Sequence, residues 1–384
     1  MHTLIDYCKS HNRIYCYGAG RYGRELCVFL SEQGIKLDGF VVTNRDPGVE
    51  RVLEVKVYEP DEIESTGDNG WIAAVGDRFS EEIVSMLRER GVKDAFFMND
   101  ALLEDIERES HYDRTYPNNQ YVNILLYHRI ANSEDDFWNL CVSPVHFEEQ
   151  IRWITEHYPV YRFADDFGTI REPAVVVTFD DGYRDNLEHA LPILEKYNVP
   201  ATFFISTGSI GGGYWWDRLY AGMNGEDKEA ILEKRNMLRK MEEKKRNEWL
   251  AKYPEVDLAM NLHELQCLAA HPLTDIGAHT VSHPSLSDLS EDAQRYEIRD
   301  SVQILEEIAG HEITSFSYPM GYYNNTTLSI LENRGIKKSA TVRGGLSGTG
   351  NPLLLPRNVV RNQTIDDFAK FIKRCFCVHA EVRQ

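Results

Sequence analysis

Two adjacent carboxylates follow a stretch of the sequence that predicts a buried strand. The apolar run 174–179 is typical of a parallel strand covered on both faces, and Asp180, Asp181 and Gly182 come directly after it. Two carboxylates at such a point are costly unless cations or hydrogen bonds meet them. The pair therefore indicates a catalytic or metal-binding site, and its alternative role is to cap the helix that follows.

Two histidines four residues apart supply a second set of candidate ligands. His279 and His283 lie in the string 277–284, and their spacing can bring both imidazoles to one metal ion. The alternative is a chance pairing among the 13 histidines of the chain. One carboxylate and two imidazoles make three protein ligands with an open position, which is typical of a catalytic metal rather than a structural one.

A third string, Phe316-Ser317-Tyr318-Pro319-Met320-Gly321, completes a resemblance to a known family. Together with TFDDG at 178–182 and HxxxH at 279–283, it makes the region from about Val122 to the C-terminus resemble the polysaccharide deacetylases of carbohydrate esterase family 4, the NodB-homology fold. The resemblance covers roughly two-thirds of the chain.

The resemblance implies roles for five residues of these strings. Asp180 becomes the general base, and Asp181, His279 and His283 become ligands of a divalent metal, zinc in the first place with cobalt or nickel as alternatives. The backbone N–H of Met320 becomes a donor to the oxyanion. Such an ion lowers the pKa of a bound water toward about 7, and this supplies the nucleophile that deacetylation needs.

Two groups of the family are missing from their usual places. Ser317 stands where the family usually carries an Arg that steadies the base, and Arg357 is a candidate to replace that Arg, with a simple structural role as its alternative. The usual Leu-x-His motif, source of the general acid, is not recognisable near the C-terminus, where His379 is a poor substitute. His128, at the end of an early strand, is the better candidate, because circularly permuted deacetylases of this fold supply their acid there. A structural histidine is the alternative.

Aromatic residues after a glycine-rich loop are candidates for sugar contact. Trp215, Trp216 and Asp217 follow the glycines 211–213. Exposed aromatic rings beside an active site commonly stack on sugars, while a carboxylate bonds their hydroxyl groups. Tyr318 is a further candidate for substrate binding. The alternative for the tryptophans is that one of them anchors a helical insertion.

The elements that must position these residues predict an α/β chain of two domains. Residues 1–115 alternate short strands and helices, which predicts a small Rossmann-like parallel sheet, and a segment rich in turn residues, 109–121, is the expected linker. Residues 116–384 contain six or more strand–helix units, the size of a barrel, and the resemblance makes this a distorted (β/α)7-type deacetylase barrel. The charge-rich run at about 225–265 predicts a solvated helical insertion over the barrel mouth.

A glycine loop in the first domain is a candidate nucleotide site. Gly18, Gly20 and Gly23 match G-x-G-x-x-G between a predicted strand and a predicted helix. The acidic residue expected at the end of the second strand is absent, since 41–44 read Val-Val-Thr-Asn. Binding of a nucleotide or nucleotide-sugar and a purely structural or docking role are both open, and hydride chemistry is the least favoured.

Composition excludes some partners and favours one compartment. The chain has 42 Lys and Arg against 61 Asp and Glu, a net charge of −19, which argues against nucleic acid or an anionic membrane as the main partner. No apolar run reaches the roughly 18 residues of a membrane span, and residues 1–13 lack the apolar core of a secretory signal. Seven scattered cysteines form no disulfide framework and suit a reducing cytoplasm.

These observations predict a cytoplasmic, metal-dependent hydrolase acting on carbon–nitrogen bonds other than peptide bonds. It would remove an acetyl group, N-linked in the first place, from a sugar, a nucleotide-sugar or a lipid-linked sugar of surface polysaccharide biosynthesis. One alternative is a catalytically silent carbohydrate-binding module, favoured only by the altered third motif. The other is an NAD-dependent oxidoreductase acting through the first domain. The oligomeric state is not predicted.

Overall fold

The chain divides into two compact units with separate apolar cores. The units are Met1–Pro117 with Cys377–Gln384, and Asn118–Phe376. The computed structural model describes residues 2–43, 50–53, 55–63, 68–74, 83, 86–92, 94–109, 122–132, 135–170, 172–347 and 351–377. The predicted linker at 109–121 lies almost wholly outside these ranges, and so does His379.

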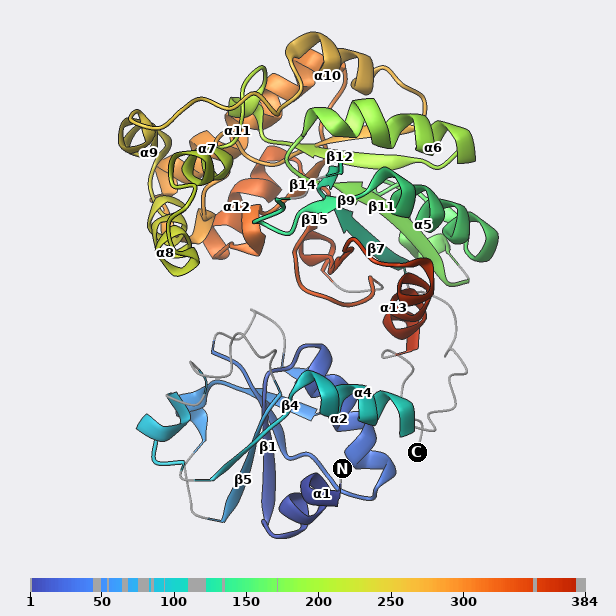
Figure 1. Cartoon of the computed structure of the whole chain (residues 1–384), viewed down its shortest axis with the longest axis vertical. Helices are drawn as coiled ribbons and strands as arrows, with labels where there is room; N and C mark the ends of the chain where they lie inside the picture. Colours follow the sequence, from blue (N-terminus) through green and yellow to red (C-terminus); the bar gives the residue numbers. More distant parts are fainter. Residues whose placement is uncertain are drawn as a thin grey trace. The chain divides into compact units, whose positions relative to one another are not determined.

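The first unit is built on a six-stranded sheet in the order β3-β4-β2-β1-β5-β6 (Figure 1). Its strands are β1 (Arg13–Tyr17), β2 (Gly39–Val41), β3 (Arg51–Val52), β4 (Val55–Tyr58), β5 (Asn69–Ala73) and β6 (Ala95–Phe97). All pairs are parallel except β3 with β4, so the sheet is mixed and not purely parallel as predicted. Its described helices are α1 (His2–Lys9), α2 (Arg21–Glu32), η1 (Pro60–Glu62) and α4 (Asp100–Glu109).

Parallel strands form the centre of the second unit. In the order β15-β14-β13-β12-β11-β7-β16, every neighbouring pair is parallel. These strands are β7 (Val122–Tyr127), β11 (Ala174–Phe179), β12 (Ala201–Ile205), β13 (Thr274–Ala278), β14 (Ser315–Ser317), β15 (Lys338–Ala340) and β16 (Asn358–Val359). The short β10 (Val160–Tyr161) also pairs with β11, while β8 (Arg129–Ile130) and β9 (Cys141–Val142) pair apart from the main sheet.

The curled sheet meets its own far edge just before β16. The Leu355 N–H donates to the Ser339 carbonyl oxygen at 2.9 Å, and the Thr341 N–H donates to the Leu355 carbonyl oxygen at 2.8 Å. The segment that leads into β16 therefore pairs with β15, the strand at the opposite end of the order. The predicted α/β fold with a distorted seven-stranded barrel is confirmed.

Alternate residues of the barrel strands enter two different apolar clusters. Leu125, Val177 and Phe203 belong to the larger cluster, which includes residues of the surrounding helices. Their chain neighbours Ile124, Val176 and Phe204 join a smaller cluster with residues of β15 and the closing segment. Because side chains alternate along a strand, the smaller cluster fills the inside of the barrel and the larger one lies under the helices.

Helices connect the barrel strands (Figure 1). Ser143, Asn261, Ser290 and Asn324 cap four of them by accepting a backbone N–H at the first turn. The helices are α5 (Pro144–His157), α6 (Leu191–Tyr197, preceded by the π turn η3, Asn186–Ala190), α10 (Leu262–Ala269), α11 (Glu291–Ala309), α12 (Asn325–Arg334) and α13 (Ile365–Cys377). Single turns occur at η2 (Phe167–Thr169), η4 (Thr207–Ser209), η5 (Leu286–Asp288), η6 (Pro319–Gly321) and η7 (Pro352–Leu354).

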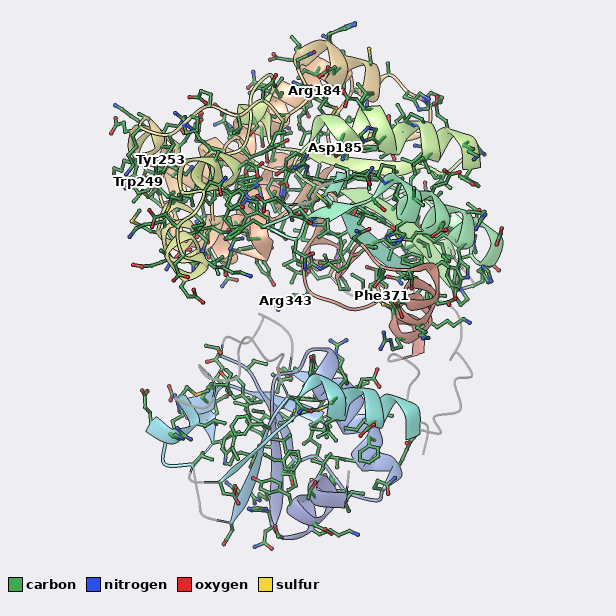
Figure 2. All side chains as sticks on the ribbon, viewed as in Figure 1. Arg184, Asp185, Trp249, Tyr253, Arg343 and Phe371 are labelled. Carbon is green, nitrogen blue, oxygen red and sulfur yellow. The ribbon has the colours of Figure 1, made fainter. Side chains whose placement is uncertain are left out.

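A helical insertion separates β12 from β13. It contains α7 (Trp215–Gly222), α8 (Lys228–Leu238) and α9 (Glu243–Leu250), which share an apolar cluster of their own. Figure 2 labels Trp249 and Tyr253 on this insertion, where their ring centroids lie 5.5 Å apart, and Asp185 nearer the barrel strands. The predicted helical character of 225–265 is present in α8 and α9, while α10 already belongs to the barrel helices. Across the described ranges, none of the helices combines the length and apolar character that crossing a membrane requires.

Candidate metal centre and active site

Most of the predicted residues lie at the carboxyl ends of the barrel strands. Asp180 and Asp181 follow β11, His279 follows β13 and His128 follows β7. Arg357 comes immediately before β16, and Ser317 is the last residue of β14. Active sites of β/α barrels are built at this end of their strands, because the loops that leave it can aim side chains at a common point.

Asp181, His279 and His283 converge on one point. Asp181 Oδ1 lies 3.6 Å from His279 Nε2 and 3.4 Å from His283 Nε2. The three donor atoms lie within 4.8 Å of one another, and at most 8% of each residue is exposed. Metal–ligand bonds of about 2.0–2.2 Å place neighbouring donors of a tetrahedral site roughly 3.3–3.5 Å apart. The two distances from Asp181 Oδ1 are close to that spacing.

The protonation of this cluster also fits a divalent ion. His279 Nδ1 lies 2.8 Å from the Ser317 carbonyl oxygen, so it carries the proton and leaves the Nε2 lone pair directed at the cluster. Burial lowers the pKa of His279 and, more strongly, that of His283, so both rings are neutral at pH 7. Burial, then Asp180 and Asp217, raises the pKa of Asp181.

A buried acceptor in the cluster lacks a hydrogen bond. Asp181 Oδ1 has no hydrogen-bond partner among the described residues. Such an orphaned oxygen is costly unless a cation meets it. The donor set of one carboxylate and two imidazoles is suited to zinc and to cobalt or nickel. The residues present therefore fit a divalent ion.

Unusual backbone conformations gather at the same place. Asp181, Thr280, His283 and Met320 have φ values of 77°, 67°, 56° and 54°. Residues other than glycine rarely adopt this left-handed region, and each instance costs on the order of 1–3 kcal/mol unless the surroundings hold it. Among the described residues these four make up more than half of the seven non-glycine cases. The backbone strain is therefore concentrated at the candidate ligands and the residues beside them.

Asp180 is held by a two-pronged ion pair. Arg357 Nη1 donates to Asp180 Oδ1 at 2.7 Å and Arg357 Nη2 donates to Oδ2 at 2.6 Å. The guanidinium is fully buried, its Nε donates to the Thr341 carbonyl oxygen at 3.0 Å, and its carbon lies 5.5 Å from the centroid of the Phe204 ring. The pair therefore covers the apolar interior of the barrel at the mouth.

The ion pair keeps Asp180 ionised in spite of its burial. Burial alone would raise the pKa of this carboxyl, but Arg357 and then His279 outweigh it and lower the pKa to about 2. Ser317 joins the pair, since its hydroxyl donates to Asp180 Oδ2 at 3.1 Å and accepts from Arg357 Nη2 at 2.7 Å. Ser317 therefore links the Asp180 carboxylate to an arginine from a distant part of the chain.

His128 lies near this pair at the end of β7. Burial, then Arg357 and His279, lowers its pKa to about 4, against the opposing effect of Asp180. Its ring is half-buried and makes no hydrogen bond to any residue that the structure describes. The backbone on either side is fixed, because Asn186 donates to the His128 carbonyl oxygen at 2.8 Å and Asp185 accepts the Ile130 N–H at 2.9 Å. Its role as the general acid stays a prediction.

Met320 offers a free backbone donor. It lies in the single turn η6, and its N–H reaches no acceptor in the described part of the chain, whereas the N–H groups of Gly321 and Tyr322 are both bonded. The side chain packs against the apolar cluster of the insertion. The predicted oxyanion donor is thus available for a ligand, and the assignment itself stays a prediction.

The two tryptophans are not the exposed platform that the sequence suggested. Trp215 is 7% exposed and Trp216 is 5% exposed. The Trp215 indole N–H donates to the His283 carbonyl oxygen at 3.2 Å, and the Trp216 indole N–H donates to the Tyr183 hydroxyl at 2.9 Å. The centroid of the Trp216 ring lies 4.4 Å from the centroid of the His283 ring. The expectation of exposed stacking rings is wrong, because both indoles are buried and their N–H groups are bonded to the His283 carbonyl oxygen and to the Tyr183 hydroxyl.

Tyr318 and Asp217, two predicted substrate-binding residues, differ in their exposure and in their hydrogen bonds. Tyr318 is fully buried and its hydroxyl donates to the Leu353 carbonyl oxygen at 2.8 Å, so its hydroxyl is already engaged within the protein, and its substrate contact stays a prediction. Asp217 is partly exposed and accepts the Tyr183 hydroxyl on Oδ2 at 2.8 Å. Burial raises the pKa of Asp217 to about 6. Of the predicted substrate-binding residues, Asp217 has a carboxylate oxygen, Oδ1, without a hydrogen-bond partner among the described residues.

The glycine loop of the first unit has the shape that its motif predicts. Gly18 has a φ of 103° and its N–H donates to the Val41 carbonyl oxygen. A Cβ at Gly23 would lie 1.9 Å from the Gly18 carbonyl oxygen, whereas one at Gly20 would meet nothing within 4 Å. The first glycine therefore makes the turn and the third lets helix α2 approach the loop. Nucleotide binding at this loop stays a prediction.

Comparisons with known proteins relate part of the second unit to a known family. Residues 168–339, less than half of the chain, match the family described as polysaccharide deacetylase. The Bacillus subtilis protein YxkH, whose name assigns it to these deacetylases, is 26% identical over 229 residues, 58% of this chain and 64% of the relative. The alignment thus spans less than two thirds of that relative's length.

Two further relatives are more specific in name. The poly-beta-1,6-N-acetyl-D-glucosamine N-deacetylase of Staphylococcus aureus is 24% identical over 253 residues, covering 63% of this chain and 74% of the relative. The structure of a de-N-acetylase from Aggregatibacter actinomycetemcomitans has a TM-score of 0.50 and 15% identity, and covers 66% of this chain and 99% of that one. The last likeness concerns the fold alone.

Proposed function

We propose that the protein is a metal-dependent deacetylase that hydrolyses the N-acetyl group of a sugar in surface polysaccharide biosynthesis. One observation carries the proposal: Asp181, His279 and His283 converge at the spacing of metal ligands, beside an Asp180 carboxylate that Arg357 keeps ionised. A divalent ion held by the three ligands would activate a water molecule and polarise the acetyl carbonyl.

Asp180 acts as the proton acceptor. Because its pKa is about 2, the carboxylate is ionised throughout the neutral range and can take a proton from the attacking water. Arg357 and Ser317 fix the carboxylate by three hydrogen bonds, so its position does not depend on the metal. The free N–H of Met320 is available to bind the oxygen that becomes negative as the carbonyl carbon turns tetrahedral.

His128 supplies the proton for the leaving amine. Its pKa of about 4 means that it is neutral at pH 7 before reaction, so it must gain a proton before it can give one. Asp180 is the group that most favours the protonated ring. A proton taken from water by Asp180 is therefore the natural source of the proton that His128 passes on.

The substrate class rests on the relatives and on the site. The name of the Staphylococcus aureus relative specifies an N-acetylated glucosamine polymer, which supports an N-acetyl sugar here. Asp217 is the carboxylate that we assign to a sugar hydroxyl. We place the protein in the cytoplasm, acting on a nucleotide-linked or lipid-linked sugar, and the six described cysteines with free thiols are compatible with a reducing compartment. A nucleotide or nucleotide-sugar would bind at the glycine loop of the first unit.

The altered third motif no longer favours a silent binding module. Its missing arginine is the support for that alternative, and here Arg357 makes the ion pair with Asp180. Acetate release decides between the two functions. The purified protein, loaded with zinc or cobalt, is incubated with N-acetylglucosamine oligomers, and Asp180→Asn serves as the matched variant. We expect the variant to retain the metal and to lose turnover by several orders of magnitude; near-normal acetate release would show that the base is assigned wrongly.

A further inference from the structure

The two candidate histidine ligands are held in different ways. His279 is fixed through its outer ring nitrogen, which donates to the Ser317 carbonyl oxygen at 2.8 Å. The corresponding Nδ1 of His283 is buried and has no hydrogen-bond partner among the described residues. Metal-binding histidines generally use that nitrogen to set their ring orientation. The orientation of the His283 ring must therefore be set by its backbone and by the rings that pack on it.

Glu297 of α11 binds one edge of the backbone before His283. Its Oε2 accepts the Val281 N–H at 2.9 Å and the Ser282 N–H at 2.8 Å, while Oε1 accepts the Ser282 hydroxyl at 2.5 Å. Within the loop, the His283 N–H donates to Thr280 Oγ1 at 3.0 Å. These bonds hold a segment whose two ends, Thr280 and His283, both have positive φ values.

The helical insertion binds the opposite edge of the same backbone. Arg246 of α9 donates through Nη2 to the Ser282 carbonyl oxygen at 2.5 Å, and Trp215 of α7 donates to the His283 carbonyl oxygen. The two groups also contact each other, since the Arg246 guanidinium carbon lies 5.2 Å from the centroid of the Trp215 ring. The insertion therefore reaches the two carbonyl groups nearest the ligand.

The burial of the Arg246 guanidinium costs free energy that the described contacts only partly offset. It is 1% exposed and forms no ion pair with a carboxylate in the described ranges. Its other acceptor is the Met241 carbonyl oxygen at 3.4 Å, and its Nε has no partner among the described residues. A buried guanidinium without a paired carboxylate carries a desolvation cost of several kcal/mol. Glu297, across the loop, is the anion that most offsets its charge.

We propose that Arg246 is a positioning residue for the metal ligand His283. The insertion then forms the outer wall of the metal centre and sets its affinity, with Arg246 at the carbonyl edge of the loop and Glu297 at its N–H edge. This inference rests on the proposed metal site. It distinguishes the two histidines, because a change in the insertion would displace His283 and leave His279 fixed by Ser317.

A matched pair of substitutions on α9 tests the proposal. Arg246→Met removes the donor to the loop, and Lys245→Met removes an equal charge from the exposed neighbouring residue. Zinc dissociation constants are measured by competition with a chelator, and the absorption spectrum of the cobalt-loaded protein reports the ligand geometry. We expect Arg246→Met to weaken zinc binding by about 10–100-fold and to change the cobalt spectrum. Lys245→Met should change neither, and Arg246→Lys should recover part of the affinity.

The thermal unfolding of the metal-free proteins is recorded alongside. Zinc affinity and a cobalt spectrum equal to those of the wild type in Arg246→Met would overturn the proposal, whatever the loss of stability. If Arg246→Met does not fold, Trp215→Phe, which removes the donor to the His283 carbonyl, gives the same test, and unchanged zinc affinity in that variant would equally overturn it.

Asp181→Asn separates this inference from the proposed function. If the wild type binds zinc no more tightly than Asp181→Asn, the metal site itself is wrong, and the role of Arg246 falls with it. If the wild type binds zinc and Asp181→Asn does not, the site stands, and the comparison of Arg246→Met with Lys245→Met alone decides the inference.

Discussion

Removing Arg357 should leave the buried Asp180 carboxylate at the barrel mouth without a counter-ion. Arg357→Met keeps an unbranched apolar stem but takes away both hydrogen bonds to Asp180, at 2.7 and 2.6 Å. Breaking a buried ion pair in this way costs about 3–5 kcal/mol, because the remaining charge has no counter-ion. The fall in the pKa of Asp180 from 3.8 to about 2 corresponds to roughly 2 kcal/mol in favour of the ionised form.

A double-mutant cycle isolates this interaction. Asp180→Asn, Arg357→Met and the double variant are unfolded in urea at pH 7, with fluorescence dominated by the second unit, which holds five of the six tryptophans. The double variant should be more stable than the sum of the single losses predicts, by about 2 kcal/mol or more. A coupling energy below about 0.5 kcal/mol would refute the claim that the pair is tightly linked.

The pH dependence of the folding stability gives a second test of the ion pair between Asp180 and Arg357. The pKa of Asp180 is lower in the folded protein than in the unfolded chain, so the ion pair contributes its full stability above about pH 4. That contribution is lost as the pH falls from about 4 toward 2, because the unfolded chain binds the proton first. Arg357→Met should therefore be less sensitive to acid over this interval than the wild type.

Three further predictions concern the reaction. His283→Ala or His279→Ala should lower zinc occupancy, measured by elemental analysis of the purified protein; full occupancy in either would remove that histidine from the ligand set. His128→Gln should reduce acetate release by about 100-fold or more at saturating metal, and an unchanged rate would return His128 to a structural role. Met320→Gly should leave kcat within a few-fold, because the backbone N–H and the positive φ are both retained; a loss above 100-fold would mean that the side chain itself takes part.

Local sequence patterns were sufficient to predict the strand ends and the motif-bearing loops. The apolar run before Asp180 forms β11 because every second side chain packs inside the barrel and the others pack under helices. The HxxxH string brings both rings together as its spacing indicated, although it does so on a loop with positive φ at Thr280 and not on a helix. Local spacing and the apolar pattern sufficed for these features.

Contacts between distant segments could not be predicted from spacing. Arg357 and Asp180 lie 177 residues apart, and the closing of the barrel at Leu355 is what brings them together. Arg246 lies in a charge-rich run that resembles a solvated surface, and the burial of one cation among exposed neighbours leaves no trace in composition. Likewise, Trp215 and Trp216 would have the same sequence pattern whether they faced a sugar or supported a loop. In the structure their indole N–H groups bond to the His283 carbonyl oxygen and to the Tyr183 hydroxyl.

Acetate release from N-acetylglucosamine oligomers, before and after removal of bound metal with a chelator, tests the central claim most directly. The account predicts that release stops when the metal is stripped and returns when one equivalent of zinc or cobalt per chain is added, and that Asp181→Asn does not recover under the same conditions. Release that persists at the original rate in the stripped protein, or a full recovery of Asp181→Asn with one equivalent of metal, would contradict it.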